Sequence, residues 1–491
     1  MFDFSKIDPL HLLEFLHQGL LDEDIEEVLR HFSKLPQRVQ FSLIKYLREN
    51  LRDSISPQAL TRGLRISIED AERILRGPSV IAKIVLFEKE LKAGKISRAL
   101  IIPETSKIIT NLPRLRTSLK EIAEFVGKPF AIFFEDAFSG KSFMLPVAVA
   151  LQISKIPESL VFTGKLNKRG QIFEVSDIIF KREIVEKEGY RLVAPPRVNN
   201  FSVIKTFLEK STWSIPFYVT SSGKEEFDKF LEDFKGERII EGMPLFEGLE
   251  IFYGLSKDDF CIVTGQLAET NKWQEVVATF YKKINKIKNE LPGNKIFHFA
   301  MRGPAALAFS LGVVFGHFDP FVFYHFQTIE GILRYHPIEV LTPRYLKERM
   351  REFKVLRPKF EEGGKNLAVI LNFSHHEATS DVKKFMQERV GEASFLVLET
   401  EYKGNLPISL FLEVAKESAS YLQNLREKYS FESYYFFFSC PIPIAFMVGL
   451  AFGHYADGWI YNYEKEEAIY RPVLNFKVLR KIKEEGNLPA F

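Results

Sequence analysis

Residues 133–151, FFEDAFSGKSFMLPVAVAL, place two serines in a turn between an apolar run and a helix of small residues. The triplet 140–142 (GKS) is identical to the last three residues of the P-loop motif, which binds phosphates. That motif also needs a glycine five residues before the triplet, where this chain has Glu135. Carboxylates at Glu135 and Asp136 would repel a triphosphate, so the sequence argues against a nucleotide here. A turn into a helix exposes a hydroxyl and supplies amide N–H groups for an oxyanion, which favours Ser142 as a nucleophile.

A serine nucleophile needs a base. Residues 79–234 contain no histidine, which excludes a Ser-His-Asp triad within this block. A lysine can serve instead when burial lowers its pKa. Lys181 follows the apolar residues 178–180, which would desolvate its ammonium group. The alternative is an ordinary lysine that reaches from a packed helix to solvent.

These segments resemble the Lon-type Ser-Lys protease domain. The run 140–151 (GKSFMLPVAVAL) is similar to the nucleophile turn and helix of that family. Residues 163–164 (TG) and 169–171 (RGQ) are similar to the segment that follows. The resemblance covers about 150 residues and implies that Ser142 is the nucleophile and Lys181 the catalytic lysine.

Two departures from the family pattern leave alternatives open. The family's Gly-Pro before the serine is Gly140-Lys141 here, and the segment before Thr163 is shorter. If the alignment is shifted so that Asp136 takes the family's aspartate position, Ser139 becomes the nucleophile. A third interpretation makes Ser142 a helix N-cap without chemistry.

Three blocks must position these residues. Residues 1–78 have helical periodicity and end in a helix-turn-helix-like spacing. We interpret this region as a docking module without DNA binding, because Glu69 and Asp70 would repel DNA phosphates. Residues 79–234 alternate strands and helices and form the protease-like block, and residues 236–491 form the third block.

The third block contains an internal repeat with one constant interval (441 − 304 = 137). Each copy reads strand, turn, apolar helix and strand, which predicts two copies of one α/β unit, about 236–345 and 346–491. The uncharged run 433–456 is not expected to span a membrane, because its twin carries Arg302. We interpret the repeated histidines as capping or core residues, with no metal site. The residues Pro304, Ala308, Phe309, Gly312, Gly316 and His317 recur as Pro441, Ala445, Phe446, Gly449, Gly453 and His454.

The repeat resembles the SAVED domain, a fusion of two CARF-like folds that senses cyclic oligonucleotides in antiphage signalling. Ligands of parallel α/β folds gather at strand C-termini, where helix N-termini face anions. There Arg302 can hold a phosphate through two hydrogen bonds. Tyr324, Tyr461 and Tyr463 are candidates to stack on bases, and the alternative is that they belong to the core, as aromatic residues on strands more often do. The candidate ligand-binding residues are Thr264, Gly265, Gln266, Arg302, Gly303, Pro304, Ser374, His375, His376, Ser439, Cys440 and Pro441.

Composition sets the remaining expectations. The chain is 46% hydrophobic and 27% charged, which predicts a soluble, globular protein. Its 491 residues predict several domains, and the strand–helix patterns described above make the predicted fold class multidomain α/β. A net charge of +3 is too small to indicate a polyanionic partner. The two cysteines lie in apolar runs, and the N-terminus lacks a secretory signal, so we expect reduced thiols and a cytoplasmic location.

Together the blocks are similar to the CRISPR-associated SAVED–Lon proteases. That resemblance implies an ATP-independent serine endopeptidase of type III CRISPR signalling that needs no cofactor for its chemistry. A cyclic oligoadenylate, expected to be cyclic tetra-adenylate, would assemble monomers into a homo-oligomer that cleaves an anti-sigma-factor-like partner. One alternative is an effector that responds to a cyclic trinucleotide from another antiphage system. A second is a ligand-responsive, non-enzymatic DNA-binding regulator with a degenerate protease fold.

Overall fold

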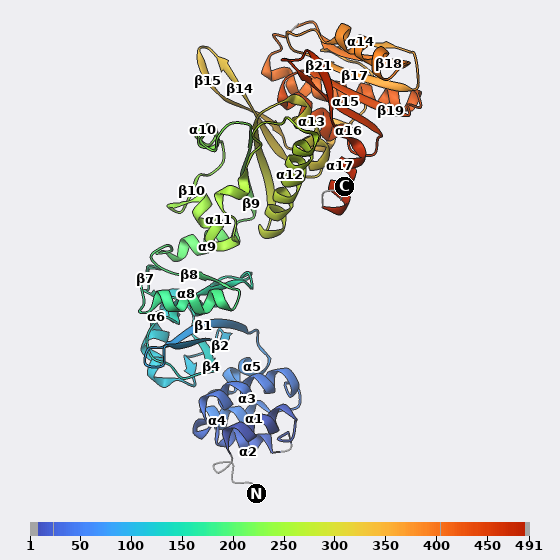
Figure 1. The fold of residues 1–491 in the computed structure, drawn as a ribbon. Coiled ribbons are helices and arrows are strands. Elements are labelled where there is room, and N and C mark those ends of the chain that lie inside the picture. Colours follow the sequence, from blue (N-terminus) through green and yellow to red (C-terminus); the bar gives the residue numbers. More distant parts are fainter. Residues whose placement is uncertain (1–7, 23, 403, 487–491) are drawn as a thin grey trace. The chain divides into compact units, whose positions relative to one another are not determined.

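The computed structural model describes residues 8–22, 24–402 and 404–486, and the chain folds into two compact units (Figure 1). The first unit contains the chain up to Glu209 together with Ile239–Phe252. The second contains Lys210–Arg238 and the chain from Tyr253 onward. The mixed α/β, multidomain class predicted from the sequence is confirmed.

The first unit is built on a mixed sheet. Its strands are β1 (Val80–Glu88), β2 (Ala93–Pro103), β3 (Ile109–Thr110), β4 (Phe130–Phe134), β5 (Leu160–Phe162) and β8 (Arg191–Val193), in the order β3-β4-β2-β1-β5-β8. β1 and β2 form a long antiparallel hairpin, and β5 runs parallel to β1 and β8. Two short hairpins pair β6 (Lys165–Leu166) with β7 (Ile172–Phe173) and β10 (Ile239–Ile240) with β11 (Met243–Pro244). Every residue of β4 is buried, which requires cover on both faces of the sheet.

Helices provide that cover. The helices of the first unit are α1 (Pro9–His17), α2 (Ile25–Arg30), α3 (Gln37–Asn50), α4 (Pro57–Leu64), α5 (Ile68–Arg76), α6 (Arg116–Val126), α7 (Met144–Gln152), α8 (Ile178–Lys187), α9 (Phe201–Glu209) and α11 (Leu245–Tyr253). Successive side chains of a strand point to opposite faces. On β4, Phe133 packs against Phe32 of the N-terminal helical region, whereas Phe134 packs against Phe143 just before α7. The N-terminal helices and α7 therefore cover opposite faces.

The N-terminal helical region shares its core with the sheet. Its buried residues form one cluster with Leu100 and Ile102 of β2 and with Phe133 of β4. The region predicted as a separate domain, 1–78, is thus part of a larger unit in the structure. Asp70 of α5 is buried and accepts hydrogen bonds from Ser106 N and Oγ (2.7 and 2.5 Å), which tie α5 to the segment after β2.

The second unit contains one sheet of five strands and one of six. The first joins β9 (Thr212–Thr220), β12 (Cys261–Val263), β13 (Asn294–Arg302), β14 (Phe321–Ile329) and β15 (Ile332–Val340), in the order β12-β9-β13-β14-β15. The second joins β16 (Leu356–Glu361), β17 (Asn366–Asn372), β18 (Ala393–Thr400), β19 (Ser433–Ser439), β20 (Gly458–Glu464) and β21 (Ile469–Asn475), in the order β16-β18-β17-β19-β20-β21. The helices are α10 (Glu225–Asp233), α12 (Thr270–Glu290), α13 (Ala305–Phe315), α14 (Thr379–Arg389), α15 (Phe411–Lys428), α16 (Ile442–Phe452) and α17 (Phe476–Glu485).

The repeat predicted from the sequence is confirmed. β13, α13, β14 and β15 recur as β19, α16, β20 and β21, and α13 and α16 begin 137 residues apart (442 − 305). The two helices pack closely through their glycines. A Cβ at Gly312 would lie 2.0 Å from the carbonyl oxygen of Phe446, and one at Gly449 would lie 2.1 Å from that of Phe309. These contacts are equivalent (446 − 309 = 137), so the copies face each other across an approximate two-fold axis.

One boundary predicted from the sequence differs from the structure. We expected residues 215–234 to form the last strand, turn and helix of the middle block, but their strand belongs to β9, which pairs with β12 and β13 in the second unit. The reason lies in the repeat: β13 pairs with β14 on one side and takes β9 as its second parallel neighbour, as β19 pairs with β20 on one side and with β17 on the other. The alternation of strand and helix does not reveal which sheet a strand joins.

The uncharged run 433–456 forms β19 and α16. Across the described ranges, no helix combines the length and the apolar character needed to cross a membrane.

Candidate active site and ligand-binding face

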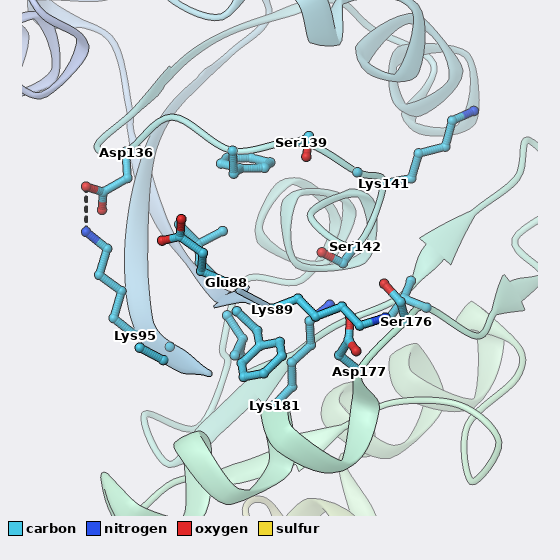
Figure 2. A pocket seen from close by; sticks show the side chains of 18 of the residues that line it. Glu88, Lys89, Lys95, Asp136, Ser139, Lys141, Ser142, Ser176, Asp177 and Lys181 are labelled. Atoms are coloured by element: carbon cyan, nitrogen blue, oxygen red, sulfur yellow. Dashed lines mark hydrogen bonds and ion pairs between the residues drawn. The ribbon is translucent and has the colours of Figure 1, made fainter. Parts of the chain in front are cut away.

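The first unit contains a cavity of about 1000 Å³ where the turn before α7 faces the N-terminal end of α8. Ser139, Ser142 and Lys181 all line it. Figure 2 shows Ser142 and Lys181 directed into the same space from these two elements. The fold therefore brings together three residues that the sequence singled out, although Lys181 follows Ser142 by 39 positions (181 − 142).

Ser142 lies in the part of its turn that backbone hydrogen bonds hold. Its carbonyl oxygen accepts a hydrogen bond from Gly164 N, and Leu145 N donates to Gly164 O, both at 3.1 Å. A Cβ at Gly164 would lie 2.7 Å from Ile172 Cγ2, so a larger residue there would displace the Ile172 side chain. Ser142 is half-buried, whereas Ser139 is exposed on the irregular part of the loop.

The turn also offers hydrogen-bond donors. Met144 N and Leu145 N are bonded to Lys141 O and Gly164 O. The N–H groups of Ser142 and Phe143 have no acceptor among the residues that the structure describes. Free amides beside a hydroxyl at the start of a helix can stabilise a developing oxyanion.

Lys181 is only 6% exposed. Burial lowers the pKa of its ammonium group, and the carboxylate of Asp177 acts in the opposite direction. Asp177 immediately precedes α8 and has a left-handed conformation (φ 62°). Its side chain does not cap the helix. No acceptor for Lys181 Nζ is found within the described part of the chain. A buried lysine with a lowered pKa is the state that a general base requires.

The carboxylates at the start of the loop are engaged by the protein. Glu135 accepts two hydrogen bonds from the guanidinium group of Arg98, each 2.9 Å long. Asp136 accepts hydrogen bonds from Lys95 Nζ (2.7 Å) and Ser97 Oγ (2.8 Å). Both acids therefore anchor the loop.

Lys141 does not act as a P-loop lysine would. Its side chain points away from the cavity in Figure 2, and its Nζ lies 3.5 Å from Glu121 Oε1. The turn thus lacks both the glycine and the lysine orientation of a P-loop, since Glu135 stands at the glycine position.

The predicted ligand-binding residues of the second unit lie at the C-terminal ends of neighbouring strands. Residues 264–266 follow β12, and Val263, Thr220 and Arg302 are aligned across β12, β9 and β13. In the other sheet, residues 374–376 follow β17, whose Asn372 is aligned with Ser439 of β19. Residues 303–304 and 440–441 lead from β13 and β19 into α13 and α16. Each sheet thus gathers its predicted residues at one edge.

Arg302 is already engaged. Its guanidinium group forms an ion pair with Glu226 of α10 and lies 4.8 Å from the ring centre of Phe326. Its equivalent in the second copy is Ser439 (439 − 302 = 137), whose Oγ donates to His376 O at 2.6 Å. The strand ends of the two sheets are therefore chemically different at this position, because the first sheet has the guanidinium group of Arg302 where the second has the hydroxyl of Ser439.

The structure corrects two of the three tyrosine candidates. Tyr324 is 1% exposed, and its hydroxyl contacts His298 Nδ1 (2.9 Å) and Lys235 N (3.0 Å). Tyr461 is 7% exposed and belongs to a hydrophobic core cluster. Neither can stack on a base, since both pack within the unit. Tyr463 is half-buried beside His376, with their ring centres 5.4 Å apart.

Sequence reasoning missed one turn on this face. Residues 221–223 follow β9 as residues 374–376 follow β17. The backbone agrees, because Ser221 N donates to Arg302 O as Phe373 N and Ser374 N donate to Ser439 O. The strand–turn–helix signal was visible in the sequence, but it was assigned to the middle block.

The repeated histidines and the two cysteines are wholly or partly buried. Burial lowers the pKa of His454 to about 4, and it lowers the pKa of the half-buried His317 as well. Cys261 and Cys440 are free thiols, and burial raises the pKa of both. Among the described residues, no group of three or more His, Cys, Asp and Glu side chains is placed to hold a metal.

Residues 259–338 and 345–476 match the family model of the "SMODS-associated and fused to various effectors sensor domain", SAVED. The C-terminal region therefore contains a SAVED sensor domain, and the matched residues make up less than half of the chain. No curated protein matches the chain.

Among solved structures, the Acinetobacter baumannii Cap4 SAVED/CARF-domain containing receptor with the cyclic trinucleotide 2'3'3'-cAAA is 12% identical, with a TM-score of 0.35. That alignment covers 53% of this chain and 51% of the receptor. The Moraxella osloensis Cap4 receptor is also 12% identical, with a TM-score of 0.29, and the alignment covers 54% of this chain and 50% of that receptor. The chain thus spans about half the length of these receptors.

Proposed function

We propose that this chain is a serine endopeptidase controlled by its SAVED domain, with Ser142 as nucleophile and Lys181 as general base. The observation that carries the proposal is the shared cavity, into which both side chains point and in which the lysine is buried. A lysine that merely snorkels to solvent would not be 6% exposed beside a serine.

The proposed reaction follows from these positions. Neutral Lys181 takes the proton of Ser142 Oγ as the oxygen attacks a peptide carbonyl carbon. The N–H groups of Ser142 and Phe143 stabilise the oxyanion of the tetrahedral intermediate. The lysine ammonium then protonates the departing amine, and an acyl-enzyme remains. Water, deprotonated by the same lysine, then attacks the ester carbonyl. The lysine ammonium returns this proton to Ser142 Oγ as the acid is released, which restores the free serine and the neutral lysine.

No hydrogen bond joins Ser142 to Lys181 in the described structure. Activation therefore has to bring Lys181 Nζ within hydrogen-bonding distance of Ser142 Oγ. We assign that step to ligand binding at the strand ends of the SAVED domain, where Arg302 and the amides of α13 would meet phosphate groups. The proposed ligand is a cyclic oligoadenylate, with tetra-adenylate as the expected ring. Its binding would assemble monomers into a homo-oligomer.

In this proposal the enzyme acts in the cytoplasm, in type III CRISPR signalling, and its substrate is an anti-sigma-factor-like protein. The reaction needs no cofactor. The substrate can be identified by incubating the protein with candidate partner proteins and detecting the cleavage products on a gel.

The test is covalent labelling of the full chain by a fluorophosphonate, with and without cyclic tri-, tetra- and hexa-adenylate. One ring should accelerate labelling, with light scattering showing growth in size, and mass spectrometry should place the adduct on Ser142. Ser142→Ala and Lys181→Ala should each abolish labelling while the nucleotide still binds. An adduct that persists in Ser142→Ala but disappears in Ser139→Ala would move the nucleophile to Ser139. The absence of any adduct with all three rings would refute the proposal.

A further inference from the structure

The loop that carries both serines, residues 135–143, has little regular structure of its own. Side chains from elsewhere hold its carbonyl groups. Gln37 Nε2 donates to Asp136 O at 2.9 Å and to Phe134 O at 3.4 Å. On the same chain segment, Arg114 donates to Phe138 O at 2.6 Å. The position of the nucleophile therefore depends on residues distant in sequence.

Gln37 is the first residue of α3, which belongs to the N-terminal helical region. It does not act alone. Phe41, one turn further along α3, has its ring centre 5.7 Å from the guanidinium group of Arg98, which holds Glu135. The hydrogen bond from Arg98 lowers the pKa of Glu135, and the charge of Arg38 adds to this effect. Three residues within one turn of α3 thus act on the segment 134–136.

A glutamine suits this position, because its amide donates to two carbonyl oxygens without adding a charge. A side chain of equal length without a donor would remove the hydrogen bond to Asp136 O and release one wall of the loop, whereas Phe134 O would keep its hydrogen bond from Asn111 Nδ2 (2.9 Å). Misplacement of a reacting group by about 1 Å can cost about 100-fold in rate.

We propose that Gln37 is a positioning residue for the nucleophile loop, through which the N-terminal helical region holds the active site in its reactive geometry. This inference rests on the proposed protease function. It assigns a role to a region that the sequence had suggested only as a docking module. Gln37 itself does not touch the reacting atoms.

The experiment compares Gln37→Met, which keeps the length and removes the donors, with Gln37→Lys, which restores a donor. Gln18→Met is the matched control, because Gln18 is an exposed glutamine of the same helical region. Fluorophosphonate labelling of the nucleotide-activated full chain is analysed as a maximal rate and a half-saturating probe concentration.

We expect Gln37→Met to lower the maximal rate at least about tenfold, with little change in half-saturation. Gln37→Lys should recover most of the rate, Gln18→Met should label normally, and the thermal unfolding midpoints should agree. Gln37→Glu provides a second variant, since its carboxylate would face two carbonyl oxygens and should slow labelling further.

Wild-type labelling rates in Gln37→Met and Gln37→Glu would overturn the inference, as would a Gln37→Lys variant no faster than Gln37→Met. These outcomes are distinct from failure of the proposed function, which would appear as no labelling of the wild-type chain with any of the three rings. They are also distinct from a change of nucleophile, which would appear as labelling that persists in Ser142→Ala but disappears in Ser139→Ala.

Discussion

Replacing Gly312 by alanine tests the close packing of α13 against α16. In an ordinary helix this change stabilises by about 1 kcal/mol, because glycine loses more backbone entropy on folding. Here the new Cβ would lie 2.0 Å from Phe446 O, 2.9 Å from its carbonyl carbon and 3.0 Å from Leu450 N. An ordinary contact begins at 3.4 Å, so the helices would have to separate by 1.4 Å (3.4 − 2.0).

The expected result is a net loss of stability of the second unit. Overpacking of a tight core costs about 3 kcal/mol at the upper end of its usual range. Subtracting the gain of about 1 kcal/mol in helix propensity leaves a net loss of about 2 kcal/mol. Gly449→Ala meets the equivalent contact, 2.1 Å from Phe309 O, and should cost as much. Because one separation of the helices relieves both clashes, the double variant should lose less than the sum.

Tryptophan fluorescence during urea unfolding is a selective assay. The chain has three tryptophans, Trp213, Trp273 and Trp459, and all lie in the second unit. Ser310→Ala in the same helix is a control, since it removes an atom from a buried site where Gly312→Ala adds one. An unchanged or higher unfolding midpoint in Gly312→Ala, or full additivity in the double variant, would refute the packing argument.

Two further predictions concern the sites. Labelling of Ser142 should rise with pH as Lys181 loses its proton, with a midpoint below the ordinary lysine value of 10.5. Asp177→Asn should move that midpoint to lower pH, because Asp177 favours the ammonium form, and an upward shift in the pH profile would contradict this. Arg302→Glu should weaken binding of the activating cyclic nucleotide at least tenfold, whereas Glu226→Gln should strengthen it severalfold by freeing the guanidinium group. Equal affinities of both variants in calorimetry would remove Arg302 from the ligand site.

Much of the second unit could be predicted because its information is local and repeated. Strand, glycine-containing helix and strand recur at one interval, and the same residues end and begin the same elements in both copies. The turns at Arg302 and Ser439 follow from that pattern, since the C-terminal ends of parallel strands share one edge. Burial of Tyr324 and Tyr461 did not follow, because a strand pattern does not show which face a neighbouring helix covers.

The sequence by itself determined the residue types of the candidate active site: a serine in a tight turn, no histidine in its block, and a lysine after an apolar run. It also determined the repeat of the sensor domain. Only the tertiary structure decided that Ser142 and Lys181 share a cavity, that β9 belongs to the sensor sheet, and that Gln37 holds a loop 99 residues away. The physical reason is that hydrogen bonds and burial arise between segments that folding brings together, and their spacing along the chain carries no local signal.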